Sequence, residues 1–293
     1  MAGVLLAISG TFLFSLKPIL VKQAYELDLS SEQLITLRMI IAAPLYIAVF
    51  IYMWQRNPER RTAIKSKLPV IAGLGVLGYF IASYLDLLGL QYITAQLERV
   101  VLFCFPTIVV LLSKFLLKKP LPNNIWLLLA MSYCGILVIF GHDLVTLGSN
   151  VVYGVSLVFI SAICFAFYVI YSKPLMSETG SQVFTSIAML AASTAIFIWS
   201  LFSLPIGSLL VTPNAYFVVA VLSIFCTFIP SLLVAAAIQR IGPEFTSIVG
   251  SCGPAMTSVL AVFILGEAFT VYHFIGLVLV MSSIGLMLKT NRV

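Results

Sequence analysis

The sequence predicts an all-α integral membrane protein with ten transmembrane helices, arranged as two five-helix repeats of opposite orientation. Three observations support this fold class. Of the 293 residues, 61% are hydrophobic and 9% are charged, whereas soluble domains carry about 25% charged residues. The mean hydropathy is +1.14. Long apolar segments recur along the whole chain, and short polar or charged segments separate most of them.

The apolar segments define the individual spans. A helix needs about 20 apolar residues to cross a bilayer. The first segment, Gly3 to Val21, has no basic residues before it and further spans follow, so it is interpreted as a retained helix and not as a cleaved signal peptide. The predicted spans are 3–22, 34–54, 68–90, 96–117, 124–141, 151–171, 182–204, 214–237, 244–265 and 270–288.

The loop charges predict the orientation of these spans. Lys and Arg follow the second, fourth, sixth, eighth and tenth spans, whereas Glu and Asp gather in the opposite loops. Because cytoplasmic loops are enriched in Lys and Arg, both termini are predicted to be cytoplasmic. The net charge of +6 then reflects orientation in a lipid bilayer, and no nucleic-acid partner is expected. The expected location is a bacterial inner (plasma) membrane, and the sequence indicates no oligomeric state.

The two halves of the chain resemble each other, which predicts a first repeat at 1–147 and a second at 148–293. Because each repeat has five spans, the second enters the membrane upside down, as in transporters that work by alternating access. A static channel or scaffold is the alternative. A shift of 151 residues in the first helix and of 148 in the fourth aligns Gly3 with Gly154, Phe14 with Phe165, Lys22 with Lys173, Cys104 with Cys252 and Pro106 with Pro254.

One segment, Ala237 to Leu288, resembles the EamA-type repeat of the drug/metabolite transporter superfamily. The resemblance lies in a small, polar start of the ninth helix, in Pro254, in Gly266-Glu267 and in the glycines of the last helix. It implies a secondary transporter of small metabolites, often an exporter, with no enzymatic activity and no cofactor. The first half departs from this pattern, because Lys118-Lys119 replaces Gly266-Glu267. Glu267 is therefore interpreted chiefly as a helix-boundary residue.

Six ionisable residues fall inside the predicted spans. Each costs at least about 2.5–3.5 kcal/mol at the bilayer centre, so such residues usually face the protein interior and have a function. All six lie in the first four helices and in the predicted outer half of the membrane, and their repeat partners are uncharged except for that of Lys22. Lys17 corresponds to Tyr168, Arg38 to Met189, Asp86 to Val234, Glu98 to Thr246 and Arg99 to Ser247.

The surplus of cations among these residues predicts a site for a carboxylate- or phosphate-bearing metabolite. Lys17 is the first candidate for the anion, with Arg38 and Arg99 assisting. The alternatives are an internal salt-bridge network, or an organic cation bound by the two acids and aromatic rings. Coupling to protons through the acids and exchange without protons are both open. The predicted substrate-binding residues are Lys17, Arg38, Asp86, Glu98, Arg99 and Tyr168.

Prolines mark candidate hinges. Pro18 follows Lys17 and cannot donate to the carbonyl of Phe14, so the first helix is expected to bend or open there. Pro106 and Pro254 match in the repeats and are predicted to act as paired hinges. Gly10 is expected to leave room below Lys17 on the same helix face.

Two other patterns predict no chemistry. The GxGxxG match at 73–78 lies inside an apolar helix, so Gly75 and Gly78, with Ala82, are interpreted as a small-residue packing face. His142 and His273 lie far apart in the sequence and belong to no ligand motif, so no metal site and no catalytic residue is predicted. A membrane-embedded enzyme and a non-transporting partner protein remain as alternatives.

Overall fold

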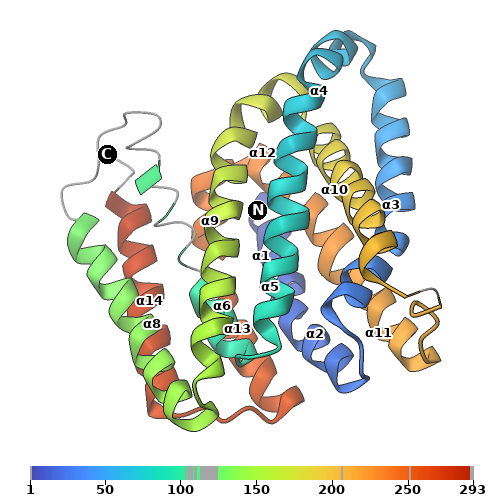
Figure 1. Ribbon diagram of the computed structural model, residues 1–293. Helices are drawn as coiled ribbons and strands as arrows, with labels where there is room; N and C mark the ends of the chain where they lie inside the picture. Colours follow the sequence, from blue (N-terminus) through green and yellow to red (C-terminus); the bar gives the residue numbers. More distant parts are fainter. Residues whose placement is uncertain are drawn as a thin grey trace.

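The computed structural model describes residues 2–102, 104, 108, 111–112, 125–205, 207–250 and 252–290. These ranges are almost entirely helical and contain no strand. In Figure 1 the helices stand side by side, with α8 and α14 at one side and α3 and α11 at the other. The elements are α1 (Ala2–Ser15), α2 (Lys17–Glu26), α3 (Ser31–Arg56), the short 3-10 helix η1 (Pro58–Arg60), α4 (Arg61–Gly75), the π-helix η2 (Val76–Ile81), α5 (Ala82–Leu90), α6 (Ala95–Leu102), α8 (Ile125–Leu147), α9 (Asn150–Thr179), α10 (Ser181–Ser203), α11 (Pro213–Ser223), the π-helix η3 (Ile224–Phe228), α12 (Ile229–Gly250), α13 (Gly253–Leu260), the π-helix η4 (Ala261–Leu265) and α14 (Val271–Thr290).

The helices confirm an integral membrane protein. Within the described residues, seven helical segments are long and apolar enough to cross a bilayer, and two shorter apolar ones cover 253–265 and 271–283. The predicted fourth span is described mainly at its start, in α6. The predicted hinge Pro106 and the pair Lys118-Lys119 lie outside the described residues.

The first span runs from Ala2 to Glu26 and contains the expected interruption, at Leu16 between α1 and α2, two residues before Pro18. One predicted boundary is wrong: the sixth span does not end at 171, because α9 continues through Pro174 to Thr179 and ends at Gly180 with φ +87°. Glycine adopts this left-handed conformation without strain and is a common residue at the end of a helix.

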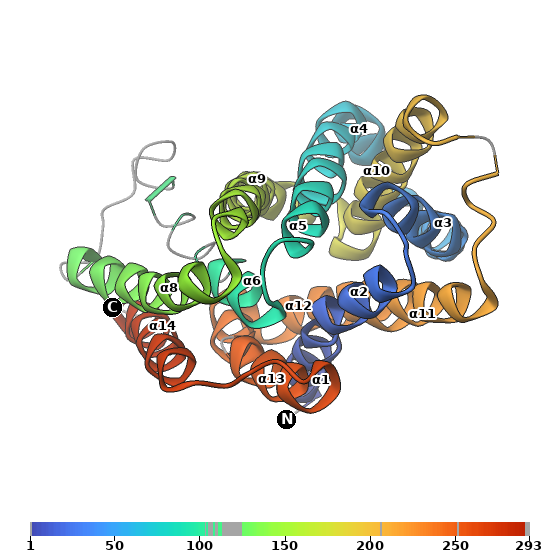
Figure 2. The same cartoon turned by 60° about the horizontal axis from the view of Figure 1, so that its bottom comes forward.

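Helices from the two halves of the chain pack against each other. The main pairs are α3 with α10, α5 with α9, α1 with α12, and α8 with α14. Figure 2 shows α8 beside α14 at one edge of the bundle and α3 beside α10 near the other. The start of α3 is fixed by two reciprocal hydrogen bonds. The backbone N–H of Gln33 donates to the side chain of Ser30, and the backbone N–H of Ser30 donates to the side chain of Gln33.

The small-residue face of the third predicted helix is confirmed. Gly75 packs directly on the backbone of Ala188 in α10, and Gly78 packs on the ring of Tyr168 in α9. The carbonyl of Ala82 accepts a hydrogen bond of 2.7 Å from the hydroxyl of Ser161. Close backbone approach of this kind is a common way for membrane helices to associate.

We expect Gly75→Val to destabilise the protein by about 1–3 kcal/mol or more, because its Cβ would overlap the backbone of Ala188. Gly73 is the matched control, since a Cβ there meets nothing within 4 Å. Thermal unfolding in detergent micelles measures both effects. A Gly75→Val variant as stable as Gly73→Ala would contradict the packing described here.

Candidate functional site

The structure brings the predicted charged residues together inside the bundle. We call Lys17, Arg38, Asp86, Glu98 and Arg99 the central charge cluster. They come from α2, α3, α5 and α6. Glu98 interacts electrostatically with Asp86, Arg99 and Lys17, and Arg38 interacts with Asp86. These residues therefore lie in one region of the bundle, and their predicted roles in substrate binding stay predictions.

Lys17 is already paired. Its ammonium forms an ion pair with Oδ2 of Asp86, which is 2% exposed. This ion pair agrees with the internal salt-bridge network, which the sequence left open as the alternative to anion binding by Lys17. The Nε atom of Arg99 lies 3.7 Å from Oε2 of Glu98, so two of the three cations lie within ion-pair distance of a carboxylate.

Arg38 differs from the other two cations. It is 2% exposed, and within the described ranges its guanidinium makes no hydrogen bond or ion pair. Asp86, Tyr46 and Tyr25 are its main electrostatic neighbours. A buried charge is normally paired, because its desolvation is costly. Among the described residues, Arg38, and not Lys17, is therefore the cation without a hydrogen bond or ion pair.

Three tyrosines extend the site beside Arg38. The hydroxyl of Tyr46, which interacts with Arg38, lies 2.8 Å from that of Ser231. The hydroxyl of Tyr168 donates to that of Tyr79 at 3.2 Å. Tyr168 is thus buried in the bundle beside Tyr79, and its predicted substrate contact stays a prediction. The sequence interpretation missed Tyr46 and Tyr79.

A spacing signal for these two tyrosines was present. Tyr46 follows Arg38 by eight residues, and Tyr79 precedes Asp86 by seven. Both separations are close to two turns and place each pair on one helix face. The charged residues thus identify the faces on which the missed aromatics lie.

The break in the first helix is held by side chains from other helices. Pro18 leaves the carbonyl of Phe14 without its helical donor, and Nη2 of Arg99 donates to that carbonyl at 2.7 Å. The hydroxyl of Thr257 donates to the carbonyl of Ser15 at 3.1 Å, and the hydroxyl of Ser15 lies 3.3 Å from the carbonyl of Gly253. Arg99 therefore binds the backbone of helix one, while the adjacent Glu98 interacts with Asp86 and Lys17.

The two described hinge candidates occupy similar places. Pro18 lies in the first turn of α2, and Pro254 lies in the first turn of α13. Each segment begins directly after a break, and the two breaks contact each other through Ser15. The hinge roles stay predictions. Gly10 does not leave room for a substrate, because Val234 and Leu233 of α12 pack against it.

We expect Arg99→Ala to cost about 1–3 kcal/mol of stability, because the carbonyl of Phe14 loses its donor in a buried place. Adding Pro18→Ala supplies a backbone N–H for the same carbonyl, so the double variant should recover part of this loss. Thermal unfolding of the two single variants and the double variant measures the coupling. Strictly additive effects would show that Arg99 does not compensate for Pro18.

A hollow opens beside the cluster. Its volume is about 610 Å³, and its lining includes Lys22, Tyr25, Glu26 and Gln91. Tyr25 also interacts with Asp86 and Arg38, and its hydroxyl lies 2.5 Å from the carbonyl of Leu87. The hollow therefore reaches a side chain that neighbours Arg38.

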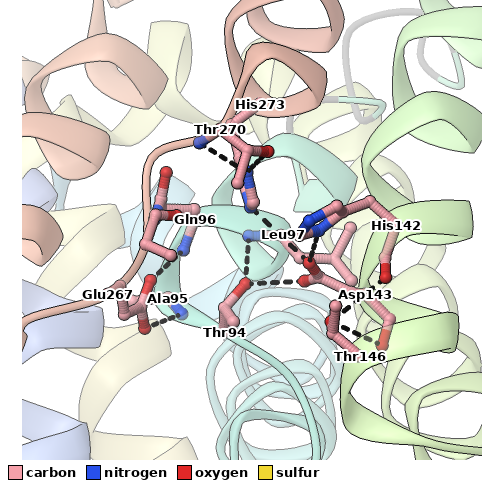
Figure 3. Close-up of polar contacts among 11 residues, drawn as sticks. Thr94, Ala95, Gln96, Leu97, His142, Asp143, Thr146, Glu267, Thr270 and His273 are labelled. Atoms are coloured by element: carbon pink, nitrogen blue, oxygen red, sulfur yellow. Dashed lines mark hydrogen bonds and ion pairs between the residues drawn. The ribbon is translucent and has the colours of Figure 1, made fainter.

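A second polar cluster lies at the start of α6 (Figure 3). The carboxylate of Glu267 accepts the backbone N–H groups of Ala95 at 2.8 Å and Gln96 at 3.3 Å. These bonds satisfy backbone N–H groups that the N-terminus of a helix leaves without a partner. Glu267 is therefore a helix-boundary residue, and the helix that it caps is α6. The sequence interpretation separated His142 from His273, yet the structure places their ring centroids 5.2 Å apart.

Comparison with known proteins agrees with this architecture. The pattern of the EamA-like transporter family matches residues 1–141 and 152–289. This chain belongs to the EamA-like transporter family. An "Uncharacterized transporter YcbK" of Bacillus subtilis is 26% identical to this EamA-like protein over 282 residues, covering 94% of the chain and 89% of the relative. An "Uncharacterized transporter" of Clostridium kluyveri is 26% identical over 218 residues, covering 73% and 70%. A solved crystal structure shares the fold, with a TM-score of 0.70, 17% identity and coverage of 99% of this chain and 98% of that one.

Proposed function

We propose that this EamA-like transporter carries a small metabolite that bears a carboxylate, with amino-acid-like zwitterions as the best-fitting class. The family and the transporter names of its relatives place the chain among membrane transporters and not among enzymes. The substrate class rests on the central charge cluster. Transport is proposed to be secondary active or facilitative, as the resemblance to the EamA-type repeat implies.

The observation that carries the proposal is Arg38, a buried cation without a hydrogen bond or ion pair in the described part of the chain. Once Lys17 is paired with Asp86 and Arg99 lies beside Glu98, the cluster keeps one positive charge in excess. A carboxylate is the geometric match for a guanidinium, since it accepts two parallel hydrogen bonds. A substrate carboxylate would supply the partner that Arg38 lacks among the described residues.

The acids support a substrate with an amino group as well. Oδ1 of Asp86 and both carboxylate oxygens of Glu98 are buried without a hydrogen-bond partner among the described residues. An ammonium group donates up to three hydrogen bonds. A zwitterion would therefore satisfy Arg38 at one end and the acids at the other.

A second candidate substrate is an organic cation. Glu98 is 0% exposed, neither of its carboxylate oxygens has a hydrogen bond among the described residues, and the neighbouring tyrosine rings favour cations. An organic cation would give the two buried acids a partner but would leave Arg38 without a role. A zwitterion would give both the acids and Arg38 a partner, and it is therefore the preferred substrate class.

We further propose ten spans in an inverted five-plus-five arrangement. The π-helices η2 and η3 begin at Val76 and Ile224, a separation of 148 residues, which is the shift that aligns the fourth and ninth helices. The packing of α5 on α9 recurs as that of α12 on α1, as two related halves require. Gly3 lies beside Ile241 and Gly10 lies beside Val234, whereas Ser15 bonds Gly253, so the chain changes direction between Ile241 and Gly253.

This arrangement supports alternating access, with the two halves exchanging conformations around the cluster. The basic loops support an orientation with both termini in the cytoplasm of a bacterial cell. The family resemblance favours export as the main direction of transport. Reporter fusions at each terminus test the orientation. Opposite signals from the two termini would exclude an even number of spans.

Counterflow in liposomes tests the function. Purified protein would be reconstituted and loaded with amino acids, simple carboxylates or choline-like cations, and exchange of the matching labelled solute would be followed. We expect exchange of amino acids or carboxylates in protein-containing liposomes only. Exchange restricted to cations would establish the second candidate, and no exchange of any solute would contradict both.

A further inference from the structure

We propose that His142, Asp143 and His273 form a binding site for a divalent transition-metal ion. These are the two histidines of the whole chain, and both rings lie beside one buried carboxylate (Figure 3). His142 and Asp143 belong to α8, and His273 belongs to α14. Neither the transport proposal nor the central charge cluster uses these residues.

The ligand atoms have suitable spacing. Nδ1 of His142 lies 3.1 Å from Oδ1 of Asp143, and Nε2 of His273 lies 3.5 Å from the same oxygen. Tetrahedral Zn²⁺ with bonds of about 2.0–2.1 Å holds its ligand atoms roughly 3.3 Å apart. All three ligand atoms lie within 4.8 Å of one another, so small side-chain rotations bring the imidazoles into place.

The residues around the ligands suit a metal site. Thr94 donates from its hydroxyl to Oδ2 of Asp143 at 3.0 Å, which leaves Oδ1 for the ion. The backbone N–H of Thr270 donates to Nδ1 of His273 at 3.3 Å, and the hydroxyl of Thr270 lies 2.8 Å from the same nitrogen. Metal on Nε2 requires the proton on Nδ1, so binding would give up the longer bond from the backbone N–H, and Nδ1 would donate to the Thr270 hydroxyl instead. Such outer contacts orient metal-binding histidines.

One nitrogen in the cluster makes only a long contact in the described part of the chain. Nε2 of His273 is buried without a hydrogen bond there, its acidic neighbour is Oδ1 of Asp143 at 3.5 Å, and the residue is 3% exposed. His142 is partly exposed and lines a hollow of about 360 Å³ together with Thr146 and Tyr272. An ion can enter through this hollow, and a water can fill the fourth position.

The ligand types select the ion. Two imidazoles and one carboxylate favour Zn²⁺ and neighbouring first-row ions over Ca²⁺ or Mg²⁺, which prefer oxygen ligands. A bound ion would join α8 to α14. It would also restrict the side chain of Asp143, which accepts a hydrogen bond from the hydroxyl of Thr94. The backbone N–H of Leu97 in α6 donates to that hydroxyl at 3.1 Å, so the ion would be connected to the start of α6 as well.

Titration calorimetry with Zn²⁺ on tag-free protein in detergent tests the site. We expect one saturable site per chain, a rise in Tm with Zn²⁺, and, with Co²⁺, absorption of a tetrahedral nitrogen–oxygen site. His273→Ala or Asp143→Asn should abolish these signals. Thr270→Val, which removes an outer contact, should weaken binding about tenfold.

Two further variants keep the test decisive. Cys134→Ser removes an exposed thiol from α8 and should leave Zn²⁺ binding unchanged. His142→Gln changes a partly exposed ligand and replaces Asp143→Asn if that variant does not fold. Absence of saturable binding to the unmodified protein, unchanged binding in the histidine variants, or its loss in Cys134→Ser would each overturn the proposal.

Discussion

Arg38→Met should abolish exchange of carboxylate-bearing substrates while leaving the protein folded. The guanidinium is buried and has no internal partner among the described residues, so its substitution removes the proposed anion contact without breaking an ion pair. Loss of a buried charged contact costs about 2–5 kcal/mol, and 3 kcal/mol is roughly a 100-fold loss of affinity. Counterflow in liposomes measures the transport effect.

Stability separates this role from a structural one. Burying an unpaired charge is unfavourable, so Arg38→Met should leave the Tm unchanged or raise it. Methionine also occupies the matching repeat position, Met189, which is 1% exposed. The neighbouring substitution Met39→Leu is the control and should keep exchange. A marked fall in the Tm of Arg38→Met would show that Arg38 has a structural partner.

The ion pair between Lys17 and Asp86 should show the opposite behaviour. Lys17→Met leaves the Asp86 carboxylate buried beside Glu98 without its partner, and breaking one side of a buried pair costs about 3–5 kcal/mol. The double variant with Asp86→Asn removes both charges and should recover most of this loss. Unfolding of the single and double variants in detergent gives the coupling energy.

An exposed pair in the same protein provides the comparison. Lys67 lies 3.7 Å from Glu178, with side chains 39% and 49% exposed. The same double-variant cycle there should give a coupling energy of at most about 1 kcal/mol. Equal coupling in the two pairs would mean that Asp86 finds another cation, such as Arg38, when Lys17 is absent.

The all-helical membrane fold and the gathering of the buried charges were predictable because both depend on the cost of placing charge in lipid. Lys17, Arg38, Asp86, Glu98 and Arg99 are conspicuous in apolar segments for that reason. Their pairing was not predictable, because it depends on how each helix is rotated and tilted against its neighbours. Lys17 and Arg38 look alike in the sequence, yet only Lys17 meets a carboxylate in the described part of the chain.

Residues that carry no charge, or that lie far apart in the chain, were harder to predict. Tyr46 and Tyr79 are ordinary aromatic residues of membrane helices until their spacing from a charged neighbour is considered. His142 and His273 are joined only by the packing of α8 against α14, and no local pattern encodes that contact. The interruption near Pro18 was predictable from the proline. The hydrogen bond from Arg99 to the carbonyl of Phe14 was not, because it depends on the contact between α6 and α1.

The most direct test of the account is equilibrium binding of three matched solutes: an amino acid, the carboxylic acid without its amino group, and the amine without its carboxylate. Each is measured with the unmodified protein, Arg38→Met and Glu98→Gln. The account predicts that the unmodified protein binds the amino acid best, that Arg38→Met loses the contribution of the carboxylate, and that Glu98→Gln loses that of the amine. Strongest binding of the amine, unaffected by Arg38→Met, would contradict it.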